Sequence, residues 1–135
     1  MSSRRQDRRL ATQILFQADV TGTDGPSALA AWLGSGREIP DFTRSLVQGV
    51  SDHLEEIDRT IAAHSEGWTV DRMASVDRTV LRVAAYELAF GRDVPVGVAI
   101  DEAVRAAKDL STEDSGRFVN GILGKIAREL DPNQS

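Results

Sequence analysis

The sequence contains no cysteine and only two histidines. The absence of cysteine excludes disulfide bonds, thiolate zinc sites and cysteine nucleophiles. The histidines, His53 and His64, lie about three turns apart in a predicted helix, and the chain has no third histidine to join them. We therefore expect neither a bound metal ion nor another cofactor.

Long hydrophobic runs are also absent. No run approaches the roughly 18 apolar residues that a membrane-spanning helix requires. The segment LATQILFQADV follows a basic N-terminus, as in a signal peptide, but Gln13, Gln17 and Asp19 interrupt it and no cleavage site of small residues follows. We therefore expect a cytoplasmic protein that is not attached to a membrane.

Aromatic residues make up only 5% of the chain, whereas hydrophobic residues together make up 41%. This hydrophobic content is enough to bury a core, and it separates the chain from disordered sequences, which combine low hydrophobicity with high net charge. Because 135 residues is the usual size of one domain, we predict a single domain over residues 1–135.

The sequence shows no recognisable catalytic pattern. Carboxylates are plentiful, but no pair stands apart and no nucleophile is placed beside a base. Gly121, Gly124 and Lys125 faintly resemble a phosphate-binding loop, but that motif needs four residues between its glycines, Ser or Thr after its lysine and a preceding strand. We therefore predict that the protein is not an enzyme.

Apolar residues recur at intervals of three and four along most of the chain, which is the pattern of amphipathic helices. Glycine and proline divide this pattern into segments. The predicted helices are a first one broken at Gly22, a short one over 27–33, a single long one over 40–64, one that Ser75 caps and Gly91 ends, one over 97–110, and a last one that Ser111 or Asp114 caps. Six or seven helices and no convincing strand predict the all-α fold class.

Positive charge is concentrated at the N-terminus, although the whole chain has a net charge of −5. The four arginines of this segment are Arg4, Arg5, Arg8 and Arg9. At 100° per residue they cover one flank of the first helix, where positive charge opposes the helix dipole. Guanidinium groups match the geometry of phosphate oxygens. We therefore predict that this flank binds a polyanion, and nucleic acid is the natural candidate; a solvated helix start is the alternative.

The last predicted helix offers a second candidate surface. Phe118 lies at the edge of its apolar stripe, Gly121 and Lys125 lie on the same flank, and Asp114 lies one turn earlier. A phenyl ring beside a lysine can stack on an unpaired base, which is how single-stranded RNA is often bound. Peripheral core packing is the alternative function of Phe118, and the sequence alone favours it.

Three segments together resemble one family. They are RRQDRRLATQILFQAD, VDRTVLRVAAYEL and VPVGVAIDEAVRAAKDLSTEDSGRFVNGILGKI. With YEL, IDEAV and FVNGIL in this order and spacing, the chain resembles the bacterial antitermination factor family NusB over roughly residues 4–130. The resemblance implies two packed helical bundles. It also implies binding of the boxA element of ribosomal RNA leaders jointly with NusE, a small-subunit ribosomal protein, in a complex that joins transcribing RNA polymerase and suppresses termination.

The resemblance also implies roles for individual residues. The arginine-rich first helix is an RNA-contacting element of the family, and the start of the last helix approaches RNA, with Asp114, Arg117 and Phe118 at those positions. We include Lys125 because it shares their flank. Asp77, at the start of the helix that begins near Ser75, lies on the side that meets NusE.

Several alternatives stay open at this point. The same helical domain resembles the front part of rRNA cytosine methyltransferases, although a chain that ends at residue 135 is not expected to methylate. The protein is alternatively an interaction scaffold that binds no RNA. Asp7 interrupts the arginines, so low RNA affinity without NusE is expected. Homodimers occur in some relatives, and the sequence does not decide between monomer and homodimer.

Overall fold

The computed structural model describes residues 3–91 and 94–130, and the predicted C-terminal tail 131–135 lies outside this part of the chain. The described residues form seven α-helices and one short 3-10 helix and contain no strand, which confirms the all-α prediction. The elements in chain order are α1 (Arg4–Thr21), α2 (Gly25–Gly34), α3 (Asp41–Asp52), α4 (Leu54–Ala63), η1 (Val70–Arg72), α5 (Ser75–Phe90), α6 (Val96–Leu110) and α7 (Glu113–Leu130). None of these helices is both long enough and apolar enough to cross a membrane.

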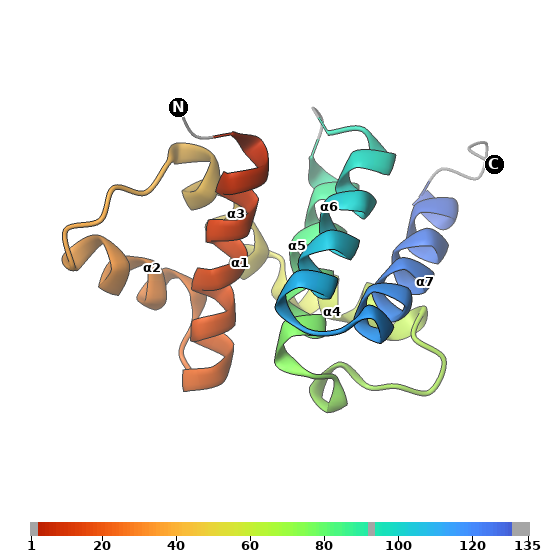
Figure 1. Cartoon of the computed structure of the whole chain (residues 1–135). Coiled ribbons are helices and arrows are strands. Elements are labelled where there is room, and N and C mark those ends of the chain that lie inside the picture. The colour runs from red at the N-terminus through yellow and green to blue at the C-terminus, as the bar shows by residue number, and fades with distance from the viewer. Residues whose placement is uncertain (1–2, 92–93, 131–135) are drawn as a thin grey trace.

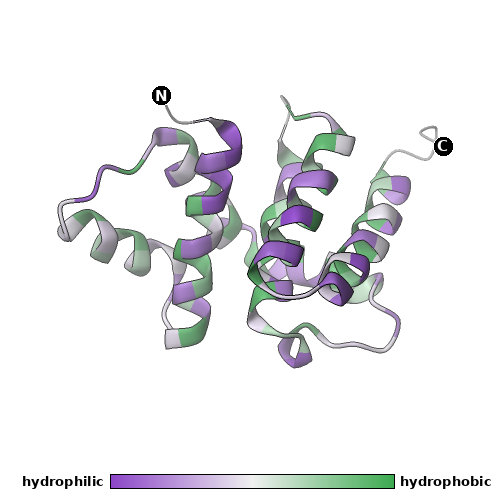
Figure 2. Ribbon diagram, viewed as in Figure 1, coloured by the Kyte–Doolittle hydropathy of each residue, from purple (hydrophilic) through white to green (hydrophobic). Residues whose placement is uncertain are grey.

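The helices form two packed groups, as the resemblance implies (Figure 1). Helices α1, α2 and α3 pack on one another, and α4, α5, α6 and α7 form the second group, in which α5 also packs on α1 and joins the two. Hydrophilic and hydrophobic residues alternate along α1, α6 and α7 (Figure 2). The fully buried residues include Ile14 and Val47 in the first group and Leu81 and Leu123 in the second, so each group contributes to the core.

The predicted single helix over 40–64 is wrong in one respect, because the chain bends at His53 and forms two helices. His53 still donates its backbone N–H to the Gly49 carbonyl at 3.2 Å. Its ring stacks on Phe90 with 4.1 Å between ring centroids. The apolar stripe stays in phase through the bend, but α3 packs on α1 whereas α4 packs on α5. The axes of α3 and α4 therefore point in different directions, and the periodicity of apolar residues alone does not reveal this change.

The contact between α3 and α5 depends on a glycine. A Cβ atom placed on Gly49 would lie 2.2 Å from the ring atom Cζ of Tyr86, well inside van der Waals contact. Tyr86 is half-buried and packs against the core. The absence of a side chain at Gly49 thus allows α3 and α5 to approach closely enough to join the two groups.

Two predicted helix caps differ from the observed ones. At the start of α7, Thr112 accepts a hydrogen bond from the Ser115 backbone N–H at 3.1 Å, so the cap is neither Ser111 nor Asp114. At the start of α5, the residue in the cap position is Ala74, and no side chain caps the helix. The Ser75 hydroxyl instead accepts a hydrogen bond from Arg78.

Ion pairs add polar contacts between the groups. Arg78 of α5 donates to Asp19 of α1 through Nε at 3.1 Å and through a terminal nitrogen at 2.7 Å. Arg82, one turn later, pairs with both Asp19 and Asp58 of α4. Burial alone would raise the pKa of the Asp19 carboxyl, but the hydrogen bonds from Arg78 and Ser75 and the two positive charges outweigh it and lower this pKa. Asp19 is therefore held ionised where α1 meets α5.

Candidate nucleic-acid interface

The first turn of α1 positions the predicted arginine flank. The Ser3 hydroxyl accepts a hydrogen bond from the Gln6 backbone N–H, and the Gln6 side chain accepts one from the Ser3 N–H, both at 3.1 Å. This capping box satisfies two helix-terminal donors. It was absent from the sequence-based reasoning, although a serine followed three residues later by a glutamine is its usual signature. It holds the first turn of α1 helical, so the arginines project from α1 at helical intervals.

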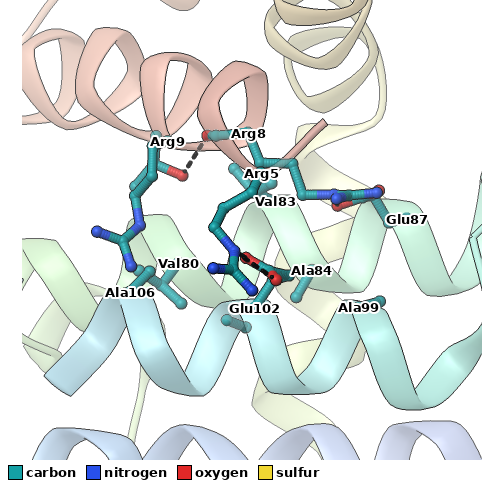
Figure 3. A pocket seen from close by; sticks show the side chains of 12 residues that line it. Arg5, Arg8, Arg9, Val80, Val83, Ala84, Glu87, Ala99, Glu102 and Ala106 are labelled. Atoms are coloured by element: carbon teal, nitrogen blue, oxygen red, sulfur yellow. Dashed lines mark hydrogen bonds and ion pairs between the residues drawn. The ribbon is translucent and has the colours of Figure 1, made fainter. Parts of the chain in front are cut away.

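The arginine flank faces the second helical group, where acidic residues meet it (Figure 3). The Arg5 Nε contacts both carboxylate oxygens of Glu102 on α6, at 3.0 and 3.1 Å. A terminal nitrogen of Arg9 contacts Asp109, also on α6, at 2.9 Å. The Arg5 side chain remains 54% exposed. These pairs therefore tie α1 to α6 while leaving Arg5 accessible to solvent.

Arg8 is buried and does not lie on the exposed flank, contrary to the sequence prediction. Its Nε lies 2.8 and 2.9 Å from the two carboxylate oxygens of Glu87 on α5, and the two side chains are only 10% and 3% exposed. Burial raises the pKa of the Glu87 carboxyl, against the hydrogen bond and charge of Arg8. The physical reason is tertiary: α5 covers this side of α1, so Arg8 joins the interior rather than a ligand-binding face.

Arg4 makes a different contact. Its guanidinium carbon lies 3.9 Å from the centroid of the Phe42 ring, and that of Arg8 lies 5.4 Å from it. Both distances are within the range of cation–π attraction. Arg4 is exposed, so its stacking on Phe42 restrains a charged group that still faces solvent.

The predicted residues of α7 lie in a second region. Arg117 pairs with Asp114, and Lys125 pairs with Glu66 in the segment between α4 and η1. Phe118 is half-buried and packs against the core, in agreement with the alternative that the sequence favoured. Its ring also meets the ring of Trp68 edge-on, with 6.3 Å between the ring centroids.

Trp68 is a surface feature that sequence reasoning missed. Its side chain is 54% exposed, although tryptophan is normally well covered. The signal was the WTVDRM segment, whose lack of helical period places a tryptophan outside any buried stripe. Trp68 thus forms an aromatic pair with the half-buried Phe118, and Glu66, two residues before Trp68, pairs with Lys125.

The predicted RNA-contacting residues thus form two regions rather than one. Helix α6 lies between α1 and α7 (Figure 1). Among the described residues, no hydrogen bond or ion pair joins the α1 arginines to Asp114, Arg117, Phe118 or Lys125. A chain-like ligand would have to cross α6 to reach both regions.

The predicted partner-binding residue lies on another element. Asp77 is in the first turn of α5, where an acidic residue is favoured by the helix dipole. Its Oδ1 atom is buried and has no hydrogen-bond partner among the described residues. A buried acceptor without a donor is costly. The residue as a whole is half-buried, so the rest of its side chain reaches the surface at the start of α5.

The histidines do not form a metal site with their neighbours in the described part of the chain. His53 lies near Glu56 at 3.6 Å, and the imidazole of His64 contacts Glu129 and the Thr60 carbonyl. No group of three or more metal-ligating residues occurs in residues 3–91 and 94–130.

Comparison with known proteins places these features in a family. The NusB family model matches residues 5–128. The transcription antitermination protein NusB of Symbiobacterium thermophilum is 50% identical over an alignment 139 positions long. The alignment covers 95% of this chain and 91% of the relative. The solved structure of T. maritima NusB is 40% identical, with a TM-score of 0.83 and coverage of 96% of this chain and 94% of that one. A NusB chain in a crystal structure of antitermination factors NusB and NusE with double-stranded RNA is 28% identical, with a TM-score of 0.82 and coverage of 93% and 96%.

Proposed function

This chain belongs to the NusB family, and from that premise we propose that it acts in transcription antitermination by binding boxA RNA of ribosomal RNA leaders together with NusE. Antitermination is achieved by binding and needs no catalysed reaction, so the protein is not an enzyme. It acts as one RNA-binding domain over residues 1–135. The resulting complex joins transcribing RNA polymerase and makes it resist termination.

The observation that carries the RNA-binding part is the placement of arginines on α1. Arg4 and Arg5 are exposed and Arg9 is half-buried. Arg5 is held at its Nε by Glu102, which leaves its terminal nitrogens available to phosphate oxygens. Preoriented guanidinium groups lose less freedom when they bind a phosphate. Arg8 supports this surface from beneath, through its buried pair with Glu87.

Helix α7 supplies the second RNA contact in this proposal. Arg117 and Lys125 provide positive charge, and Asp114 sets the position of Arg117 through their ion pair. Phe118 offers a ring for stacking on an unpaired base, a contact that depends little on base identity. The arginines of α1 then bind phosphates, while this region contacts bases.

NusE binds at the start of α5 in this proposal. The exposed part of the half-buried Asp77 side chain would accept a hydrogen bond from NusE. The solved complex of a similar chain contains NusB, NusE and RNA together. Joint binding compensates for the modest number of exposed arginines on α1.

The test is a mobility-shift assay with purified protein, NusE and a labelled boxA RNA. A shift of boxA RNA that requires both proteins, and that a scrambled RNA does not reproduce, is the expected result. A NusE complex that shifts neither RNA would contradict RNA binding and support an interaction scaffold. Equal shifts of both RNAs would contradict specificity for boxA.

A further inference from the structure

A hollow between α1 and α6 gathers positive charge from both helices. Its lining residues are Arg5, Gln6, Arg9, Leu10, Gln13, Arg105 and Asp109. Three of these seven are arginines, two are glutamines whose amides donate hydrogen bonds, and only one is acidic. In a chain with a net charge of −5, this hollow is locally cationic and open to solvent.

Arg105 is the residue that sequence reasoning did not single out. It lies one turn before Asp109 on the same face of α6, and that face lines the hollow opposite Arg9 of α1. Arg105 is exposed and forms no salt bridge with another residue in the described ranges. Its charge is therefore not paired by any carboxylate in these described ranges.

Asp109 already binds one of the guanidinium groups of the hollow. Its carboxylate accepts from a terminal nitrogen of Arg9 at 2.9 Å, and the Asp109 side chain is 63% exposed. Ion pairs this exposed contribute little to stability. A phosphodiester can replace the carboxylate, because both present negatively charged oxygens to the same guanidinium fork.

We propose that this hollow binds a phosphodiester of the RNA backbone between Arg9 and Arg105, and that Asp109 lowers RNA affinity by occupying Arg9 when RNA is absent. This inference rests on the proposed function for the identity of the ligand. It also places a phosphate contact on α6, the helix that an RNA strand must cross between α1 and α7.

The first test compares Arg105→Gln with Arg59→Gln, which removes the same charge from the exposed surface of α4. Both are measured in complex with NusE, by fluorescence anisotropy with boxA RNA at several salt concentrations. Arg105→Gln should weaken binding roughly two- to fivefold, as expected for one exposed ion pair. It should also make the slope of log K against log[salt] shallower by about 0.7. Equal effects of the two variants would overturn the proposal.

The second test compares Asp109→Asn with Asp101→Asn, which removes the same charge from exposed α6 surface outside the hollow. Asp109→Asn should tighten RNA binding roughly two- to fivefold, and Asp101→Asn should change it less. The gain should disappear when Arg9→Ala is combined with Asp109→Asn, because the carboxylate acts through Arg9. A gain that persists without Arg9, or that Asp101→Asn reproduces, would overturn the role of Asp109.

A third measurement separates this inference from the proposed function. Isotope-labelled protein is titrated with inorganic triphosphate, and amide chemical shifts report where the anion binds. If the shifts centre on Arg9, Gln13 and Arg105 but the protein binds no RNA, the hollow is an anion site and the proposed function is wrong. If the protein binds RNA and neither Arg105→Gln nor Asp109→Asn changes the affinity, the proposed function stands and the proposal that the hollow binds phosphate is wrong.

Discussion

The Nε atom of Arg8 lies between both carboxylate oxygens of Glu87, at 2.8 and 2.9 Å, in the interior between α1 and α5. Arg8 belongs to the segment that the sequence predicts to bind phosphate. In the structure it is part of the contact between the two helical groups. Its nearly complete burial distinguishes it from Arg5, whose pair with Glu102 is partly open to solvent. The same residue type in one cluster therefore serves two purposes, which can be separated by mutation.

Glu87→Gln should destabilise the protein strongly, because it leaves the Arg8 guanidinium buried without a counter-charge. Loss of one partner of a buried pair typically costs about 3–5 kcal/mol. Urea unfolding followed by circular dichroism measures this cost. Glu102→Gln is the matched control at the exposed pair and should cost about 0–1 kcal/mol. Similar costs for the two variants would show that burial does not distinguish the pairs.

Phe118→Leu should weaken binding of boxA RNA about tenfold, which corresponds to roughly 1.4 kcal/mol of lost stacking. Leucine keeps most of the apolar volume, so thermal stability should stay near normal, and the salt slope should not change because a ring neutralises no phosphate. Phe90→Leu removes a ring outside the predicted RNA-binding residues and serves as control. A Phe118→Leu protein that melts much earlier but binds RNA normally while folded would assign the ring to the core alone.

Asp77→Lys should weaken binding of NusE while the free protein stays folded. The substitution removes the carboxylate and places a positive charge at the start of α5. Reversed charge at a helix start itself costs about 0.3–1 kcal/mol, so Asp41→Lys, in the first turn of α3, measures that cost at another helix. Calorimetric titration with NusE measures affinity. Equal losses of affinity in the two variants would rule out a specific role for Asp77.

The free energy of unfolding should decrease at acidic pH, partly because Asp19 becomes protonated. Its pKa in the folded protein lies below the ordinary value of 3.8, so the unfolded chain binds more protons in this range. The stabilisation is therefore present above about pH 4 and is lost as pH falls through the folded pKa. Asp19→Asn should lower the urea midpoint at pH 7 and give a flatter decline in acid. The decline should not vanish, because the pKa values of Asp24, Glu66 and Asp71 are lowered as well. An acid profile of Asp19→Asn parallel to that of the wild type would contradict this contribution.

The sequence predicts the helices well because their signals are local. Apolar spacing and the glycines between segments are enough to place most helices. The bend at His53 escapes prediction because the apolar stripe continues in phase across it, and only the different packing partners of α3 and α4 require a change of direction. Even the misplaced cap of α7 was wrong by a single residue, since Thr112 lies beside the predicted Ser111.

The candidate site is less predictable because its properties come from distant parts of the chain. Helical spacing correctly places the arginines on one flank, but it cannot tell that Glu87 will cover Arg8. The exposure of Arg105 within a cationic hollow depends on where α6 lies against α1. Neither relationship has a local signature, because each joins residues that meet only in the folded protein.

The partners of Arg5, Arg8 and Arg9 lie 97, 79 and 100 residues later in the chain. During synthesis, the first helix therefore leaves the ribosome with its arginines unmatched, and they stay so until most of the protein has been made. Contacts of such long sequence separation also form late in folding, because large loops must close first. A nascent or truncated chain would expose these three arginines without their carboxylate partners to the RNA-rich surface on which it is made, and only the completed fold pairs them.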